Sequence, residues 1–330
     1  MKSNAGGGDM DCSVVISTWN NSKRLALTLE AFCRCVLPPT VRWELVLVNN
    51  GCLEETRRVA EQFRSRLPLV YVNEPVVGVS RARNTGLAAA SGRLLVFTDD
   101  DVTPCPQWLS AYWSAYQDRP VGYFFGGPIE SKFEGGCPDP SLFHLAPCSV
   151  KGLDYGTTAK PLGSQHPFIA PNWACPAAIL REVGGFDVRR GLNAVPGRVR
   201  VGSETHLMRQ LRKQGWCGWY VPAARLTHFV PSNKSTPHHI AVRCEAGTFD
   251  RAEAFPWSQH PGRGLRLFVA AGLRMIEWWV VWRWRERSGK DACAYLKWRE
   301  AVGWVAGFVE GLKRNAQRQV KRVAGTRRRR

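Results

Sequence analysis

The first predicted strand of the 330-residue chain is not followed by a Gly-x-Gly-x-x-Gly turn or a Gly-x-x-x-x-Gly-Lys-Ser/Thr loop. The absence of these phosphate-binding turns argues against a dinucleotide-binding domain and a P-loop domain. The 11 cysteines include no Cys-x-x-Cys pair, so no zinc framework can be read from them. Residues 1–11 contain no apolar run of the kind that opens a secretory signal, which predicts a cytoplasmic protein with reduced thiols.

Long apolar runs are also missing. The longest candidate, Leu267 to Trp282, is interrupted by Arg274 and Glu277. Charges are costly at the middle of a bilayer but are tolerated at its surface, where tryptophan is favoured. Residues 265–312, which are rich in Trp and Arg, are therefore predicted to form helices that lie on a membrane rather than cross it. Packing of the same helices against the preceding domain is the alternative.

Acidic residues are scarce toward the end of the chain. The formal net charge is +19, and residues 265–330 hold 17 Lys and Arg against five acidic residues. Residues 313–330 hold nine basic residues and no acidic one, which predicts a disordered basic tail drawn to an anionic membrane surface. Residues 1–264 are close to neutral, which argues against an enzyme acting on nucleic acid and against a specific nucleic-acid partner.

Apolar runs rich in β-branched residues alternate with helical segments from the start of the chain. We expect strands at 13–17, 43–48, 69–72 and 94–97, and helices at 22–35, 53–66 and 79–90. This alternation predicts an α/β fold with a doubly wound, mostly parallel sheet. Ligands bind such sheets beyond the carboxyl ends of the strands. The residues at these ends are Thr18-Trp19-Asn20, Asn49-Asn50-Gly51 and Asp99-Asp100-Asp101.

Three successive aspartates repel one another, and a divalent cation relieves that repulsion. Hard oxygen ligands at a strand end suit Mg²⁺ or Mn²⁺, which can bridge a protein to phosphates. A solvated acidic turn is the alternative interpretation of Asp99, Asp100 and Asp101 taken alone.

Residues 12–250 resemble family 2 glycosyltransferases with the GT-A fold. The similarity rests on four segments in order and on three later ones. The first four are Thr18-Trp19-Asn20, Val48 to Gly51, Gly78 to Gly86 and Gly92 to Asp101; the later ones are Asn172, Glu182 to Asp187 and Gly202 to Leu211. The resemblance implies a GT-A domain over residues 12–264, with a nucleotide-binding half at 12–127 and an acceptor half at 128–264. Residues 1–11 are predicted to be disordered.

The same resemblance assigns roles to individual residues. Asp99 and Asp101 match the Asp-x-Asp motif that binds the diphosphate through a metal, with Asp101 as the direct ligand. His228 resembles a late histidine of the family near the donor phosphates or the metal, where it would be a further metal ligand; a buried structural histidine is the alternative. The residues implied to bind the nucleotide sugar are Thr18, Asn20, Asn49, Arg83, Asn84, Asp99 and Asp100. Asn172 and Trp173 match acceptor-side positions, where Trp173 is expected to stack on a sugar or line an acceptor groove; packing in the core is the alternative.

A general base must take the proton of the acceptor hydroxyl in an inverting transfer. The family uses the second acidic residue of a Glu-Asp pair that opens a helix. Here the pair is Ser203-Glu204, so Glu204 falls on the base position and Ser203 replaces the first carboxylate. Asn49 is a second departure, since the family usually has Asp there.

The resemblance implies an inverting glycosyltransferase that uses a divalent metal and a nucleotide-sugar donor, with a UDP-sugar as the expected donor. The expected acceptor is a hydroxyl of a lipid-linked glycan or a cell-surface polysaccharide, and the expected location is the inner face of a membrane. Two alternatives stay open: a polyprenyl-phosphate sugar synthase, and a non-catalytic relative that binds sugar nucleotides or lipid.

Overall fold

The computed structural model describes residues 10–138, 140–192, 199–286 and 292–327, and these fall into two units. The first unit consists of Met1–Glu134, Lys151–Arg198 and Gly202–Val230. The second consists of Gly135–Val150, Val199–Val201 and Pro231–Arg330. The sequence predicts a boundary at residue 264. Residues 231–264 instead belong to the second unit, because helix α9 (Pro237–Glu253) packs along the C-terminal helix.

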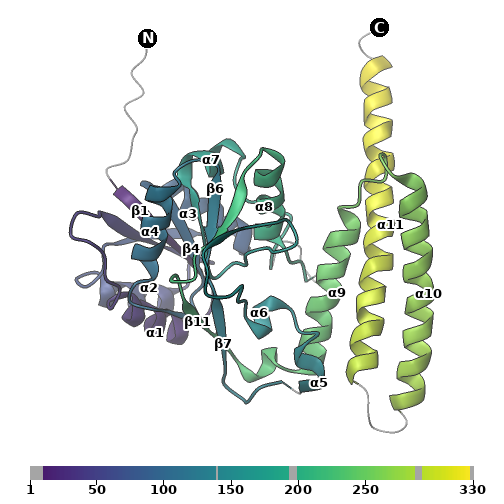
Figure 1. The fold of residues 1–330 in the computed structure, drawn as a ribbon, viewed down its shortest axis with the longest axis horizontal. Helices are drawn as coiled ribbons and strands as arrows, with labels where there is room; N and C mark the ends of the chain where they lie inside the picture. Colours follow the sequence, from purple (N-terminus) through teal and green to yellow (C-terminus); the bar gives the residue numbers. More distant parts are fainter. Residues whose placement is uncertain (1–9, 139, 193–198, 287–291, 328–330) are drawn as a thin grey trace. The chain divides into compact units, whose positions relative to one another are not determined.

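The first unit is built on a twisted sheet with helices around it (Figure 1). Its strands, in spatial order, are β3 (Leu69–Glu74), β2 (Trp43–Asn50), β1 (Met10–Thr18), β4 (Gly92–Thr98), β9 (Trp173–Pro176), β6 (Tyr123–Gly126), β10 (Cys217–Tyr220) and β8 (Lys160–Leu162). The first four strands run parallel, β9 runs antiparallel to both of its neighbours, and β8 runs antiparallel to β10. The predicted doubly wound, mostly parallel α/β sheet is confirmed.

Apolar residues fill the central strands because both faces of the sheet are covered. Val14, Val15 and Ile16 of β1 are buried, as are the facing residues of β2 and β4. The helices of this unit are α1 (Ser22–Phe32), α2 (Glu54–Phe63), α3 (Val79–Ala89), α4 (Trp108–Asp118), α7 (Ala177–Glu182) and α8 (Ser203–Lys213). The strands and helices expected in residues 13–97 occur in the expected order.

A small second sheet lies beyond the end of β4. It consists of β5 (Val102–Pro104), β11 (Leu226–Val230) and β7 (Ile129–Phe133), with β11 in the middle. His228 of β11 pairs with Val102 of β5, and the backbone N–H of Phe229 donates to the carbonyl of Asp101 at 2.9 Å. This pairing brings residues from two distant parts of the sequence to the carboxyl end of the main sheet.

The second unit is helical. Helix α11 (Ala292–Arg327) packs against both α9 and α10 (Pro261–Glu286) (Figure 1); the shorter segments are α5 (Pro140–Phe143), α6 (Cys148–Lys151) and the 3₁₀ turn Ser232–Lys234. Gly303, Gly307 and Gly311 recur every four residues on the face of α11 that meets α9. A side chain at Gly303 or Gly307 would collide with the backbone carbonyls of Glu245 or Phe249. Glycine is therefore required for the close approach of the two helices.

The structure corrects two expectations for the C-terminal region. Residues 313–327 continue helix α11 where we expected a disordered tail, because Ala, Arg, Lys and Gln are good helix formers. Trp282 of α10 and Trp298 of α11 stack on each other with ring centroids 5.0 Å apart, and Trp304 of α11 lies under the guanidinium of Arg251 of α9, so these three rings pack between helices of the unit. Residues 1–9 and 328–330 lie outside the described residues. In the described parts of the chain, no helix is long and apolar enough to span a membrane.

Candidate active site

Asp99, Asp100 and Asp101 form the turn between β4 and β5. Asp100 points toward the β1–α1 turn, where the Asn21 amide donates to its Oδ1 at 2.8 Å. The hydroxyl of Thr28 on α1 donates to the Asp100 carbonyl at 3.0 Å and fixes the turn. Burial, followed by the negative charge of Asp101, raises the pKa of Asp100 to about 7. Asp100 is thus a buried carboxyl held by polar contacts, and its neighbours on either side are the residues available to a ligand.

Asp101 and His228 approach each other across the pairing of β5 with β11. The Nε2 atom of His228 lies 3.4 Å from Oδ1 of Asp101, and both side chains are buried. The other ring nitrogen of His228, Nδ1, is buried and has no hydrogen-bond partner among the described residues. The structure therefore brings together two of the three residues predicted to bind metal, with an oxygen and a nitrogen donor side by side.

The described residues contain no complete protein cage for a metal ion. Within the described ranges, no group of three or more His, Cys, Asp or Glu side chains is placed to hold one. A nucleotide-bound Mg²⁺ needs only one or two carboxylates, because phosphates and water supply its other ligands. Burial raises the pKa of Asp99, and the nearby charge of Asp101 raises it further, so a cation would relieve an unfavourable cluster. The residues present fit a divalent ion that arrives with a diphosphate.

Arg83 links the acidic turn to helix α8. Its guanidinium is buried and donates from Nη2 to Oδ1 of Asp99 at 3.3 Å. On its other side, Nη1 donates to the Ser203 hydroxyl at 3.1 Å and to Oε2 of Glu204 at 3.4 Å. One cation thus contacts both the predicted diphosphate-binding aspartate and the predicted general base. The structure brings Asp99, Arg83 and Glu204 into a single site.

Glu204 lies in the first turn of α8, just after Gly202 and Ser203; the φ of Gly202, 74°, is left-handed. The helix N-terminus stabilises a carboxylate there through its unpaired N–H groups. The Glu204 side chain is mostly buried, with 15% of its surface exposed. A carboxylate so placed is held in orientation and can still be reached by a hydroxyl.

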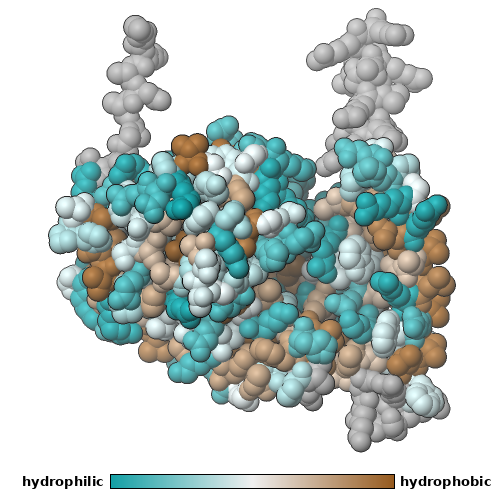
Figure 2. All heavy atoms as spheres, viewed as in Figure 1, coloured by the Kyte–Doolittle hydropathy of each residue, from teal (hydrophilic) through white to brown (hydrophobic). Residues whose placement is uncertain are grey.

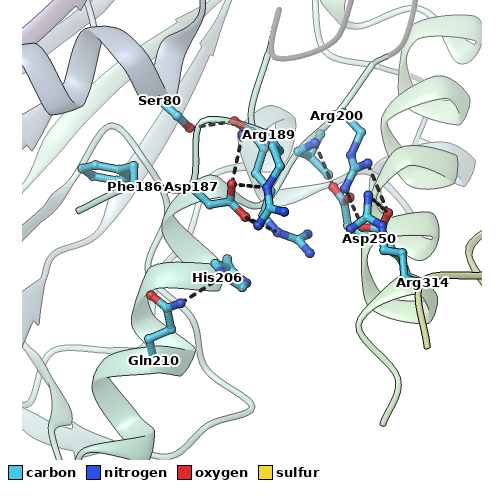
Figure 3. Close-up of polar contacts among 12 residues, drawn as sticks. Ser80, Phe186, Asp187, Arg189, Arg200, His206, Gln210, Asp250 and Arg314 are labelled. Atoms are coloured by element: carbon cyan, nitrogen blue, oxygen red, sulfur yellow. Dashed lines mark hydrogen bonds and ion pairs between the residues drawn. The ribbon is translucent and has the colours of Figure 1, made fainter. Parts of the chain in front are cut away.

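Asp187 and His206 of the first unit lie near each other, and their charges interact (Figure 3). Burial raises the pKa of Asp187, but hydrogen bonds from Arg189 outweigh that effect and lower it to about 2. Burial, followed by the charge of Arg190, lowers the pKa of His206 to about 4. His206 is therefore neutral at physiological pH, and its ring accepts from or donates to Gln210 at 3.3 Å.

Protonation of His206 is expected to destabilise the fold in acid. The pKa of His206 is about 4 in the folded chain, against 6.5 for an unperturbed histidine, so the unfolded chain binds the proton first as pH falls. The contribution of neutral His206 is complete above pH 6.5 and is lost between 6.5 and 4. His206→Gln should flatten the fall in the free energy of unfolding over this window, measured by urea denaturation, whereas exposed His166→Gln should not. Equal slopes for wild type and His206→Gln would contradict this assignment.

Three predicted ligand-binding amides are used to hold the fold. Asn49 donates to the Leu53 carbonyl at 2.8 Å and to the Tyr71 hydroxyl at 2.6 Å. Asn84 exchanges two hydrogen bonds with the backbone of Phe186. Asn172 accepts from Trp108 and Tyr112 at 2.7 Å each and donates to two carbonyls, which satisfies its amide completely. These side chains position loops around the site.

Trp173 corrects an expectation. We expected its ring to stack on a sugar, but it is fully buried, with its centroid 5.0 Å from that of Phe97 and 6.0 Å from that of Phe186. Together with the saturated amide of Asn172, this makes the acceptor-side pair part of the core. The reason is that Trp173 begins β9 and Asn172 directly precedes it, and β9 is inserted between β4 and β6.

Trp19 is a candidate that the sequence did not single out. Thr18 is buried at the end of β1, whereas Trp19 and Asn20 are exposed, and 48% of Trp19 is accessible to solvent. Its ring lies over Gly51, whose φ of 91° turns the chain after β2. Asn20 itself has a φ of 51°, in the left-handed region that a non-glycine residue adopts at some cost. A large aromatic residue directly after a predicted strand of an α/β sheet was the signal that could have identified Trp19 as a candidate ligand-binding residue.

Comparison with known proteins agrees with this geometry. Residues 13–175 match the family model described as Glycosyl transferase family 2. Over these residues, which are just under half of the chain, the sequence is that of a glycosyl transferase family 2 domain. Family membership explains why the polar segments at 18–20, 49–51, 83–84 and 99–101 meet at one edge of the sheet.

Two curated relatives share part of the family 2 domain. Glycosyltransferase AglE of Haloferax volcanii is 29% identical over 126 residues, which are 38% of this chain and 41% of AglE. Validoxylamine A glucosyltransferase of Streptomyces hygroscopicus subsp. limoneus is 33% identical over 143 residues, 40% of this chain and 29% of that protein. The matched part thus spans less than half the length of each relative.

A solved structure extends the similarity over most of the chain. The mannosyltransferase PcManGT from Pyrobaculum calidifontis, in complex with GDP-Man and Mn²⁺, superposes with a TM-score of 0.56 at 18% identity. The match covers 92% of this chain and 90% of PcManGT. At this identity the similarity establishes the fold, and the predicted GT-A fold is confirmed.

Proposed function

We propose that the protein is an inverting glycosyltransferase that moves a sugar from a nucleoside diphosphate donor to an acceptor hydroxyl. The observation that carries the proposal is the position of Arg83 between Asp99 and Glu204. A site for this reaction needs a cation at the leaving diphosphate and a base at the attacking hydroxyl, close together. The guanidinium of Arg83 contacts both the proposed diphosphate-binding residue Asp99 and the proposed base Glu204.

Each remaining group has a role in this proposal. Asp101, Asp99 and His228 hold a divalent ion, Mn²⁺ or Mg²⁺, which when bound offsets the charge of the diphosphate. Trp19 offers an exposed ring on which the nucleobase stacks, beside Thr18 and Asn20. Arg83 hydrogen-bonds the diphosphate oxygens as the sugar leaves, since charge-assisted bonds to phosphate are strong. Glu204 accepts the proton of the acceptor hydroxyl at Oε1 or Oε2.

Donor and acceptor belong to the proposal as well. A UDP-sugar is the proposed donor, and a lipid-linked glycan or cell-surface polysaccharide the proposed acceptor. The Mn²⁺ and GDP-Man in the PcManGT structure support a metal and a nucleotide sugar as a pair. The helical unit, with its basic residues, is proposed to hold the enzyme at the inner face of an anionic membrane.

Release of nucleoside diphosphate from a panel of nucleotide sugars tests the proposal. We expect one donor to be turned over with Mn²⁺ or Mg²⁺ and not with a chelator. Asp101→Ala should lower donor affinity at least about tenfold in the presence of metal and abolish the effect of the chelator, because a carboxylate ligand of the ion is lost. Exposed Asp118→Ala is the matched control and should behave as wild type.

Two results would contradict the proposal. Donor binding by calorimetry that is the same with metal, with chelator and in Asp101→Ala would remove the metal from the mechanism. Absence of both donor binding and turnover across the panel would favour a non-catalytic relative.

A further inference from the structure

Helix α10 has two different faces. One face packs on α11, where Trp282 stacks on Trp298 and Phe268 contacts Phe308. The outer face carries six large apolar side chains at spacings of three or four residues, each more than half exposed: Leu265 (59%), Val269 (52%), Leu273 (65%), Ile276 (58%), Val280 (52%) and Trp284 (74%). We call these six residues the outer stripe. Figure 2 shows apolar residues gathered along this helix.

The outer stripe is continuous and long. Spacings of three and four residues place its members on one side of a helix. From Leu265 to Trp284 it extends about 28 Å, at about 1.5 Å per residue. An apolar surface of this extent is uncommon on a protein that meets only water and indicates an interaction surface.

The charges beside the stripe identify its partner. Arg266, Arg274 and Arg283 are exposed on α10, and Glu277 is the single acidic residue between positions 261 and 284. Trp279, exposed at 48%, is a second exposed tryptophan of α10. Apolar side chains with tryptophan and a border of arginine are the pattern of a helix that lies in the headgroup layer of an anionic bilayer. If a second copy of α10 packed on this face, its arginines would lie against the arginines of the first copy and repel them.

We propose that the outer stripe of α10 inserts into the surface of an anionic bilayer, with the helix parallel to the membrane plane. The inference rests on the membrane association proposed above and specifies the residues that make it. The tryptophans of α11 do not take part, since they pack inside the helical unit. Docking along α10 would bring the enzyme to acceptors that are confined to the membrane by a lipid anchor.

Vesicle sedimentation of the full chain tests the stripe. The probes are phosphatidylcholine vesicles with and without phosphatidylglycerol, at low and high salt. Leu273→Glu with Ile276→Glu places two charges in the stripe and should lower partitioning onto the anionic vesicles at least about tenfold, because two large apolar side chains no longer leave water. The control is Ala270→Glu with Arg274→Gln, which also alters the net charge by two units at exposed positions outside the stripe.

The two variants separate the outcomes. Loss of binding in the stripe variant beyond the loss in the control supports the proposal, provided that circular dichroism shows unchanged helix content. Equal losses in both variants would mean charge attraction alone and would overturn it. A wild-type dimer in light scattering that the stripe variant converts to monomer, with no vesicle binding, would assign the face to a second copy and overturn it too.

Nucleotide-sugar hydrolysis tests the catalytic proposal independently of vesicle binding. Nucleotide-sugar hydrolysis in vesicle-free buffer needs only the site of the first unit, so the stripe variant should retain it. Vesicle binding with neither donor binding nor hydrolysis would support the stripe inference and contradict the proposed reaction. Hydrolysis without vesicle binding would support the reaction and contradict the stripe inference.

Discussion

Replacing Glu204 with glutamine is expected to lower the rate of sugar transfer about 10²–10⁴-fold, the usual contribution of a general base. Glutamine has nearly the same shape and can still accept a hydrogen bond from Arg83, which contacts Oε2 of Glu204 in the wild type. An amide cannot take a proton from the acceptor hydroxyl. Steady-state kinetics with the donor and acceptor identified by the turnover assay would show the loss in kcat, with the KM of the donor little changed.

Glu182→Gln is the matched control for this substitution. Glu182 is exposed at the end of α7, so its replacement makes the same change in charge and shape away from the site. The kinetics of this variant should equal those of the wild type. Full transfer activity in Glu204→Gln would remove the residue from the base position and favour a phosphate acceptor, which needs little base catalysis, as in a polyprenyl-phosphate sugar synthase.

Arg200→Met is expected to cost about 3–5 kcal/mol of the stability of the helical unit, the range for breaking a buried ion pair. Arg200 is 4% exposed and donates to Asp250 at 2.7 Å and to Glu253 at 2.6 Å (Figure 3). Both carboxylates are buried, and Arg314, the further cation on Glu253, is more exposed. Removal of Arg200 leaves their charge poorly compensated away from water. Urea denaturation followed by circular dichroism measures the difference.

A second ion pair between helices of the same unit supplies the control. Arg299 contacts Glu245 where both side chains are partly exposed. Arg299→Met should therefore cost about 1 kcal/mol or less, as surface pairs do. Adding Asp250→Asn and Glu253→Gln to Arg200→Met should restore part of the stability. If the triple variant were no more stable than Arg200→Met, the loss would come from packing and the electrostatic explanation would fail.

The nucleotide-side geometry was predictable because its signals are local. Short apolar runs rich in β-branched residues predicted the strands. Polar residues directly after three of these runs predicted where ligand-binding groups meet. The pairing of β11 with β5 brings His228 to Asp101. Only the family resemblance predicted that these two residues lie close together. No periodicity in the sequence links positions 101 and 228.

The acceptor side was less predictable because burial of a polar residue is a tertiary property. The amide of Asn172 is a side chain that could bind a ligand, yet it forms hydrogen bonds with four buried groups of the protein. Its neighbour Trp173 fills the core between Phe97 and Phe186. The ion pairs of Arg200 were not predictable for the same reason, since its acidic partners Asp250 and Glu253 lie about fifty residues later in the sequence, on α9.

The allocation of residues 135–150 to the helical unit imposes an order on folding during synthesis. The β-sheet unit can close around strands that end at Val230. Residues 135–150 instead contact α11 through α5 and α9 through Arg243 and Cys244. On the ribosome they must wait, together with α9, until α11 has been translated. Domains generally fold as they emerge, and incomplete ones expose apolar surface. The nascent helical unit therefore exposes apolar surface until α11 has been translated.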